Sequence, residues 1–186
     1  DRSRRLKDES RRLHVENADA GARHQRHRTV AAVLRLNVDL LGDGWWVERE
    51  EVPSGTAPAA VRALVQSHYV AAPGQVKAVY VLGQVAVPYS GNTNPDGHTE
   101  HRGAWACDGY YGEMNGTWTD ATVNNANGVH LWNHNVPGDG KFDQSDFPSP
   151  LELQVGRVDL SDLPTFTQSE AQLLQSYLSK AHQWKT

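Results

Sequence analysis

The pattern of apolar and polar positions between residues 29 and 52 predicts a helix followed by a strand. Thr29 is a typical helix cap, and LGDG at 41–44 is a typical stop and turn. Between these signals apolar side chains recur at helical spacing, at Val30, Val33, Leu34, Val38 and Leu41. The run WWVEREEV at 45–52 is rich in aromatic and β-branched residues, so it predicts a strand.

The next segment predicts a second helix and a buried strand. The turn PSGTAP at 53–58 offers Thr56 as N-cap, and the helix that follows reaches about Val70. Its predicted core face contains Val61, Leu64, Val65 and His68. The run VKAVYVLG at 76–83 is nearly continuously apolar, as in strands buried on both faces of a parallel sheet. RLHVEN at 12–17 predicts an earlier strand.

Residues 88–150 show neither a helical nor a strand period. They contain nine of the 16 glycines and three of the six tryptophans. An irregular segment of this length inside a compact domain is usually functional or disordered. Because its aromatic residues favour packing, we expect a functional insertion.

Regular structure returns at the C-terminal end. LELQVGRVDL at 151–160 alternates apolar and other residues, which predicts a strand, and Gly156 indicates a close backbone approach. TQSE at 167–170 is a capping-box pattern with Phe166 as its hydrophobic staple. The helix that follows presents Ala171, Leu174, Tyr177, Leu178 and Ala181 on one face.

These segments predict an α/β fold: a doubly wound, mostly parallel sheet with flanking helices and a long metal-binding-type loop insertion at 88–150. Residues 1–28 carry nine Lys/Arg and five Asp/Glu, a net charge of +4, whereas the whole chain carries −4. We therefore expect a basic, solvated or poorly ordered segment at 1–28 and an α/β domain at 29–186. The acidic remainder argues against nucleic-acid binding, and no apolar run approaches the ~20 residues of a membrane span.

The segment NVPGDGKFDQSD at 135–146 is similar to a calcium-binding loop of the EF-hand type. With Gly140 at the sharp turn, oxygen donors fall at the expected offsets, and Asn133 can replace a missing one. The predicted Ca²⁺ ligands are Asn133, Asn135, Asp139, the Lys141 carbonyl, Asp143 and Asp146. Pro137 offers no side-chain ligand, and Asp146 replaces the usual Glu. The alternative is an Asx/Gly turn satisfied by its own backbone.

His98 and His101 flank Glu100 in DGHTEHRG, and two histidines at this spacing can share a zinc ion. No third strong ligand is evident from the sequence, so hydrogen bonding within the loop is the favoured interpretation.

GAWACDGYYGE at 103–113 contains the only cysteine, Cys107, which excludes an internal disulfide. Cys107 with His101 or His98 would make a nucleophilic dyad, although a lone cysteine is more often a packed residue. Asp108 is the other candidate functional residue of this segment. A carboxylate walled by Trp105 and Tyr111 would bind a guanidinium or ammonium group, unless it merely forms an Asp-Gly turn.

Five segments in order resemble the gingipain-like cysteine peptidases, a caspase-fold family. They are VYVLGQVAVPYSG, DGHTEHRGAWACDGYYGEMNGTW, GDGKFD, ELQVGRVDL and a helix beginning SEAQLLQSYL, within residues 30–184. The resemblance implies a doubly wound sheet and peptide-bond hydrolysis by a Cys nucleophile and a His base. The aspartate of the family's D-x-x-Y-G motif matches Asp108 and lies in the pocket for a basic substrate side chain.

In the family, the catalytic His and Cys follow the helix after the GR strand. The resemblance therefore implies that this chain carries the substrate-pocket half, without the dyad, and works on peptide or protein substrates together with a C-terminal half. It also implies a secreted or cell-surface location. Two alternatives remain from the residues: a non-catalytic calcium-binding α/β module, and a standalone hydrolase using Cys107 and His101.

Overall fold

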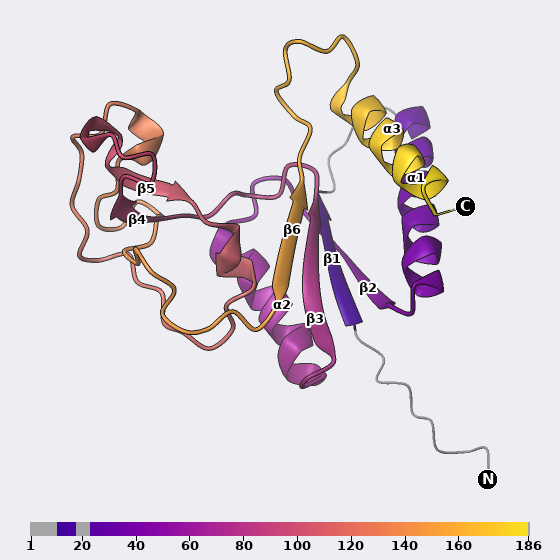
Figure 1. Cartoon of the computed structure of the whole chain (residues 1–186), viewed down its shortest axis with the longest axis horizontal. Coiled ribbons are helices and arrows are strands. Elements are labelled where there is room, and N and C mark those ends of the chain that lie inside the picture. Colours follow the sequence, from indigo (N-terminus) through magenta and orange to yellow (C-terminus); the bar gives the residue numbers. More distant parts are fainter. Residues whose placement is uncertain (1–10, 18–22, 186) are drawn as a thin grey trace. The chain divides into compact units, whose positions relative to one another are not determined.

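The computed structural model describes residues 11–17 and 23–185. Within these ranges the helices and strands follow one another in a mixed α/β order (Figure 1). They are β1 (Arg11–Asn17), α1 (Arg23–Gly42), β2 (Trp46–Val52), α2 (Pro58–Ala71), β3 (Val76–Leu82), β4 (Tyr89–Thr93), β5 (Gly103–Ala106), β6 (Gln154–Val158) and α3 (Glu170–Gln183). Three short 3₁₀ turns lie at Thr99–His101, Asp108–Tyr111 and Leu131–Asn133. The predicted α/β class is confirmed.

The main sheet has four strands in the order β2-β1-β3-β6. Strand β1 pairs in parallel with both β2 and β3, and the arrow of β6 points the same way in Figure 1. The strands predicted at 45–52 and 76–83 are therefore present, and the earlier strand predicted at 12–17 is a central member of the sheet.

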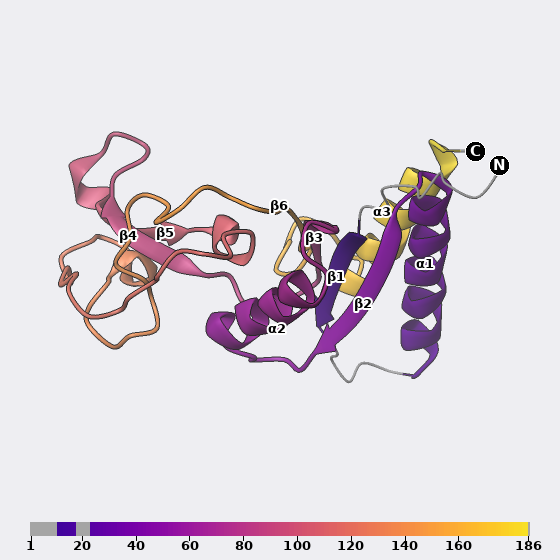
Figure 2. The ribbon, with the colours of Figure 1, turned by 90° about the horizontal axis from the view of Figure 1, so that it is seen from below.

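Helices cover both faces of this sheet. Figure 2 shows α2 on one side and the pair α1 and α3 on the other. Val33, Leu82, Leu174 and Leu178 form one buried cluster, which joins α1, β3 and α3. Because neighbouring strand residues point to opposite faces, Val81 lies on the side of α2, whose Val61 and Val65 are also buried.

The first helix begins earlier than the sequence predicts. It starts at Arg23, not at Thr29, so residues 23–28 belong to α1 and residues 11–17 belong to β1. The boundary expected at residue 28 thus falls inside a helix. Residues 1–10 and 18–22 of the predicted basic segment lie outside the described residues.

The predicted N-caps of α2 and α3 are wrong by one and two residues, respectively. The N-cap of α2 is Ala57 with Pro58 following, while Thr56 Oγ1 donates a 2.7 Å hydrogen bond back to the Pro53 carbonyl. The capping box of α3 is formed by Ser169 and Gln172, not by the first and last residues of TQSE. In each case a neighbouring residue has the extended backbone that a cap needs.

The chain divides into two compact units. The first consists of the residues up to Val85 and those from Val155 onward, and the second spans Ala86–Gln154. The second unit contains the irregular segment 88–150, the antiparallel pair β4–β5 and all three 3₁₀ turns. Over 11–17 and 23–185, no helix is both long and apolar enough to cross a membrane.

Candidate functional site

The D-x-x-Y-G segment forms a 3₁₀ turn, Asp108–Tyr111, in the second unit. Tyr111 is fully buried, and its hydroxyl donates a 2.7 Å hydrogen bond to the Ala86 carbonyl. Tyr110 is also buried and stacks on Phe142 with ring centres 4.2 Å apart. Both tyrosines therefore belong to the interior of this unit, so Tyr111 does not line an accessible pocket here.

Asp108 and Trp105 reach the surface more than Tyr111 does. Both are partly exposed, and Trp105 Nε1 donates a 3.2 Å hydrogen bond to the His101 carbonyl. A Cβ added to the neighbouring Gly109 would lie 2.4 Å from the Phe147 ring, so this ring packs directly on the turn. About half of the Phe147 side chain is exposed. Asp108 thus starts a turn beside a partly exposed aromatic ring.

Cys107 precedes this turn and is partly buried. Burial raises the pKa of its thiol, a hydrogen bond with Tyr110 lowers it, and the charge of Asp108 raises it, with a net upward shift. A raised pKa disfavours the thiolate that a nucleophile needs. Among the described residues, no hydrogen bond joins Cys107 to His101, whose Nδ1 contacts Asp96 instead. This geometry favours a packed cysteine over the dyad.

A buried carboxylate that sequence reasoning missed lies just after the turn. Glu113 is fully buried and accepts hydrogen bonds from the backbone of Asn115 and Gly116 and from Ser149 Oγ. Its Oε2 accepts a 2.6 Å bond from Trp118 Nε1. Burial raises the pKa of Glu113, but the hydrogen bonds together lower this pKa by more than burial raises it. The net shift is therefore downward. Glu113 ties the second unit together as an ionised group.

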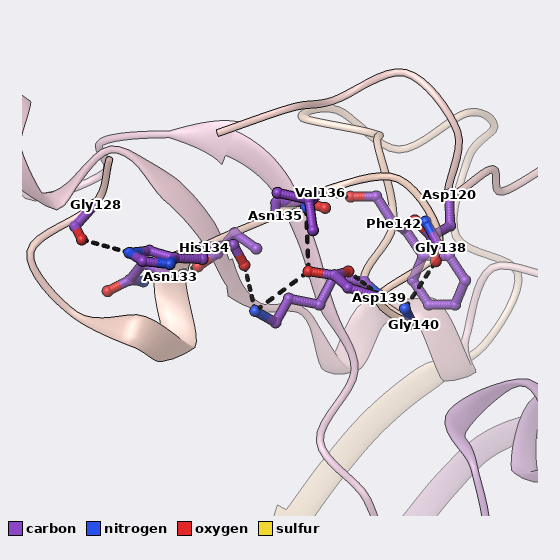
Figure 3. A network of polar contacts seen from close by, with 12 residues as sticks. Asp120, Gly128, Asn133, His134, Asn135, Val136, Gly138, Asp139, Gly140 and Phe142 are labelled. Atoms are coloured by element: carbon purple, nitrogen blue, oxygen red, sulfur yellow. Dashed lines mark hydrogen bonds and ion pairs between the residues drawn. The ribbon is translucent and has the colours of Figure 1, made fainter. Parts of the chain in front are cut away.

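In the predicted calcium loop, the two asparagines are interior residues. Asn133 and Asn135 are buried. Asn133 Nδ2 donates a 2.8 Å bond to the Ala104 carbonyl, and Asn135 Nδ2 donates to the carbonyls of Gly91 and Phe142. Both side chains are used to hold neighbouring backbone segments, as Figure 3 shows for the surroundings of Asn135.

The carboxylates of this loop are largely engaged by backbone N–H groups (Figure 3). Asp139 accepts from the backbone nitrogens of Val136, at 3.1 Å, and Lys141, at 2.9 Å. From outside the predicted loop, Asp120 accepts 2.7 Å bonds from the backbone nitrogens of Gly138 and Gly140. The Lys141 ammonium donates to the His134 carbonyl. The turn is therefore held by hydrogen bonds to Asp139 within it and to Asp120 outside it.

Asp143 is the most heavily hydrogen-bonded carboxylate of the loop. It accepts from the backbone nitrogens of Ala121, Thr122 and Val123 and from Thr119 Oγ1, at 2.7–3.1 Å. Burial raises its pKa, but these four bonds, led by the one from Val123, lower it well below the usual range. Asp146 is exposed. The pattern favours the hydrogen-bonded turn, and calcium binding stays a prediction.

The described residues bring one set of metal-ligating groups together: Asp96, His98 and His101, whose ligand atoms all lie within 4.8 Å of one another. Asp96 Oδ2 lies 3.4 Å from His98 Nδ1 and contacts His101 Nδ1 directly. The His101 ring thus hydrogen-bonds within the loop, as the sequence indicated, and His98 does so through its backbone N–H. The third ligand that the sequence did not reveal is Asp96.

The hydrogen bond between Asp96 and His101 favours the charged form of both side chains. The hydrogen bond from His101 lowers the pKa of Asp96 to about 2, opposed by burial and assisted by the backbone N–H of His98. The same hydrogen bond raises the pKa of His101. The cluster therefore holds an ionised carboxylate beside an imidazole.

Comparison with models of protein families, with curated proteins and with solved structures finds no match to this chain.

Proposed function

We propose that this chain is the substrate-pocket half of a gingipain-like cysteine peptidase with a doubly wound, caspase-like sheet. In this proposal Asp108 recognises a basic side chain of a peptide or protein substrate. A C-terminal half supplies the His/Cys dyad and adds its strands along the free edge of β6.

The spatial order of the motifs supports this proposal. The buried run VKAVYVL is β3, the VGR segment lies on β6 beside it, and the SEAQLLQSYL helix is α3. Helix α3 packs beside α1, where His182 Nδ1 lies 2.9 Å from Asp39 Oδ1. The first and the last two of the five motifs thus contribute to one sheet and its helical layer.

The observation that carries the proposal is the contrast between the two edges of the sheet. At one edge, β2 carries four consecutive charged residues, Glu48–Glu51, which is how edge strands avoid unwanted pairing. At the other edge, β6 has the sequence QVGRV, and its single charged side chain, Arg157, donates a 2.5 Å bond to the Val85 carbonyl. An edge with so little charge is suited to pairing with a further strand.

The first test joins the chain to the segment encoded directly after Thr186. We expect the chain alone to leave fluorogenic peptides with Arg or Lys before the scissile bond intact, and the joined protein to hydrolyse them. Asp108→Asn should raise KM for these peptides at least tenfold, because it removes the charge facing the substrate cation. Asp162→Asn, at an exposed carboxylate outside this unit, is the matched control.

A second readout does not depend on activity. In hydrogen exchange, the amides of β6 should become more protected in the joined protein, whereas those of β2 should not change. A reading frame that ends at Thr186, or a joined protein without peptidase activity and without added protection in β6, overturns the proposal. The first of these outcomes favours a non-catalytic binding module.

A further inference from the structure

We infer that the second unit contains a site for one divalent transition-metal ion of the zinc class, with Asp96, His98 and His101 as its three protein ligands. The three side chains come from a single six-residue stretch, DGHTEH. Their ligand atoms all lie within 4.8 Å of one another, and residues 11–17 and 23–185 contain no other such group.

One spacing in the cluster already matches tetrahedral coordination. Ligand atoms at ~2.0–2.1 Å from zinc lie roughly 3.3 Å from each other. Asp96 Oδ2 and His98 Nδ1 are 3.4 Å apart, which is close to this edge length. Asp96 and His101 are in direct hydrogen-bonded contact, so an ion would replace that hydrogen bond with two metal bonds. Both histidines present Nδ1 to the same carboxylate oxygen.

The loop is already held in the conformation that brings the ligands together. Gly97 has a positive φ of 80°, and the backbone N–H of His98 donates a 3.1 Å bond to Asp96 Oδ1. The indole of Trp105 fixes the His101 carbonyl at 3.2 Å, and the Glu100 carbonyl accepts a 3.1 Å bond from the Val129 backbone. Little further ordering is needed, which favours binding.

The chemistry of the ligands selects the metal. Imidazole nitrogen suits zinc, cobalt, nickel and copper, whereas calcium and magnesium take oxygen ligands. A set of two imidazoles and one carboxylate is therefore poorly suited to Ca²⁺, the ion predicted for the 135–146 loop. A set of three protein ligands leaves one tetrahedral position for solvent.

His130 is the nearby histidine that this site does not use. Its ring centre lies 5.7 Å from that of His101, but the ring is stacked on Trp132 at 4.4 Å with planes only 8° apart. The aromatic stacking holds His130 beside the cluster without making it a ligand. It is therefore a matched control, since it has the same chemistry and the same neighbourhood.

The experiment titrates the tag-free chain with Zn²⁺ by calorimetry in a buffer that does not chelate metals. We expect one Zn²⁺ per chain, with Co²⁺ at the same site giving the visible absorption of a tetrahedral N/O complex. His98→Ala and Asp96→Asn should each weaken Zn²⁺ binding at least tenfold. His130→Ala should retain the stoichiometry and stay within threefold of the original affinity. Ca²⁺ should not compete.

The variants are expected to fold, because the His98 side chain is 64% exposed and Asp96 is at the surface. Circular dichroism without metal checks this directly. The inference is overturned if the chain binds no Zn²⁺ at up to 1 mM, or if the His98→Ala, His101→Ala double variant retains the original affinity. A His130→Ala variant that loses binding as completely as His98→Ala overturns the three-ligand assignment. None of these outcomes depends on peptidase activity.

Discussion

Trp118 Nε1 lies 2.6 Å from Oε2 of the buried Glu113, and this bond completes a fully internal carboxylate site. The indole also packs edge-on against Tyr110, with ring centres 5.0 Å apart. One side chain thus satisfies a buried charge and contributes to the aromatic core of the second unit.

Glu113→Gln should destabilise the chain by about 2–3 kcal/mol, because hydrogen bonds to a charged group are lost and a buried amide donor is left facing other donors. Urea unfolding followed by tryptophan fluorescence measures this. Glu51→Gln is the control: its side chain is 52% exposed and pairs with Arg49, so the loss should stay below about 0.5 kcal/mol. Equal losses in both variants would contradict the assignment.

Two polar contacts, one between α1 and α3 and one just beyond the C-terminal ends of both helices, should differ in strength. Asp39 is only 11% exposed beside His182, whereas Asp43 and Lys185 are 46% and 35% exposed. Because solvent screens the second pair more, double-mutant cycles with alanine should give about 1 kcal/mol of coupling for Asp39–His182 and below about 0.5 kcal/mol for Asp43–Lys185. Reversal of this order would refute the prediction.

Asp143 should make stability depend on acid pH. Folding lowers its pKa below the ordinary value of 3.8, so the folded state favours the ionised form. Its contribution is therefore complete well above pH 3.8 and is lost as the pH falls below that value toward the folded pKa. The difference in urea midpoint between the original chain and Asp143→Asn should shrink between pH 6 and pH 3. A difference that is constant over this range would show that Asp143 does not act through its charge.

Calcium should have little effect on the melting temperature. The carboxylates of Asp139 and Asp143 already accept backbone hydrogen bonds, so the loop is held in place without an ion. We expect millimolar Ca²⁺ or EGTA to shift Tm by less than about 1 °C, measured by differential scanning fluorimetry. A saturable rise of several degrees that Asp143→Asn abolishes would instead establish the calcium loop.

The fold was predictable where hydrophobic periodicity is strong. The strand at 76–82 and the helices α1 and α3 follow from local pattern, so their existence and type are confirmed. The predicted core face of α1 is largely wrong, because Leu34, Val38 and Leu41 are exposed. Of its five predicted positions, only Val33 is buried in the core. The caps were misplaced because Thr56 and Thr167 have suitable side chains, while Ala57 and Ser169 have the required backbone. Propensity identifies the residue type, but the packing of the helix decides where its first turn begins.

The candidate sites were harder to predict because they depend on contacts that the sequence does not reveal. The histidine pair was visible, but Asp96 became a third ligand only through the turn at Gly97. The loop at 135–146 has suitable ligand oxygens, yet those of Asp143 accept hydrogen bonds from segment 119–123. The side chains of Asn133 and Asn135 are buried, and their Nδ2 groups donate to the backbone of Ala104 and Gly91. Tyr111 was expected to wall a pocket, and its hydroxyl is directed to the Ala86 carbonyl instead.

Gly103 in β5 has a consequence for the evolution of this chain. A Cβ at this position would lie 1.9 Å from the backbone oxygen of Asn133, a collision that no side-chain rotation can relieve. Every other amino acid should therefore be rejected there, although Gly103 takes part in no chemistry. A saturation library selected only for folded, soluble protein should return glycine at this codon, whereas Gly42, with nothing within 4 Å of its added Cβ, should drift freely.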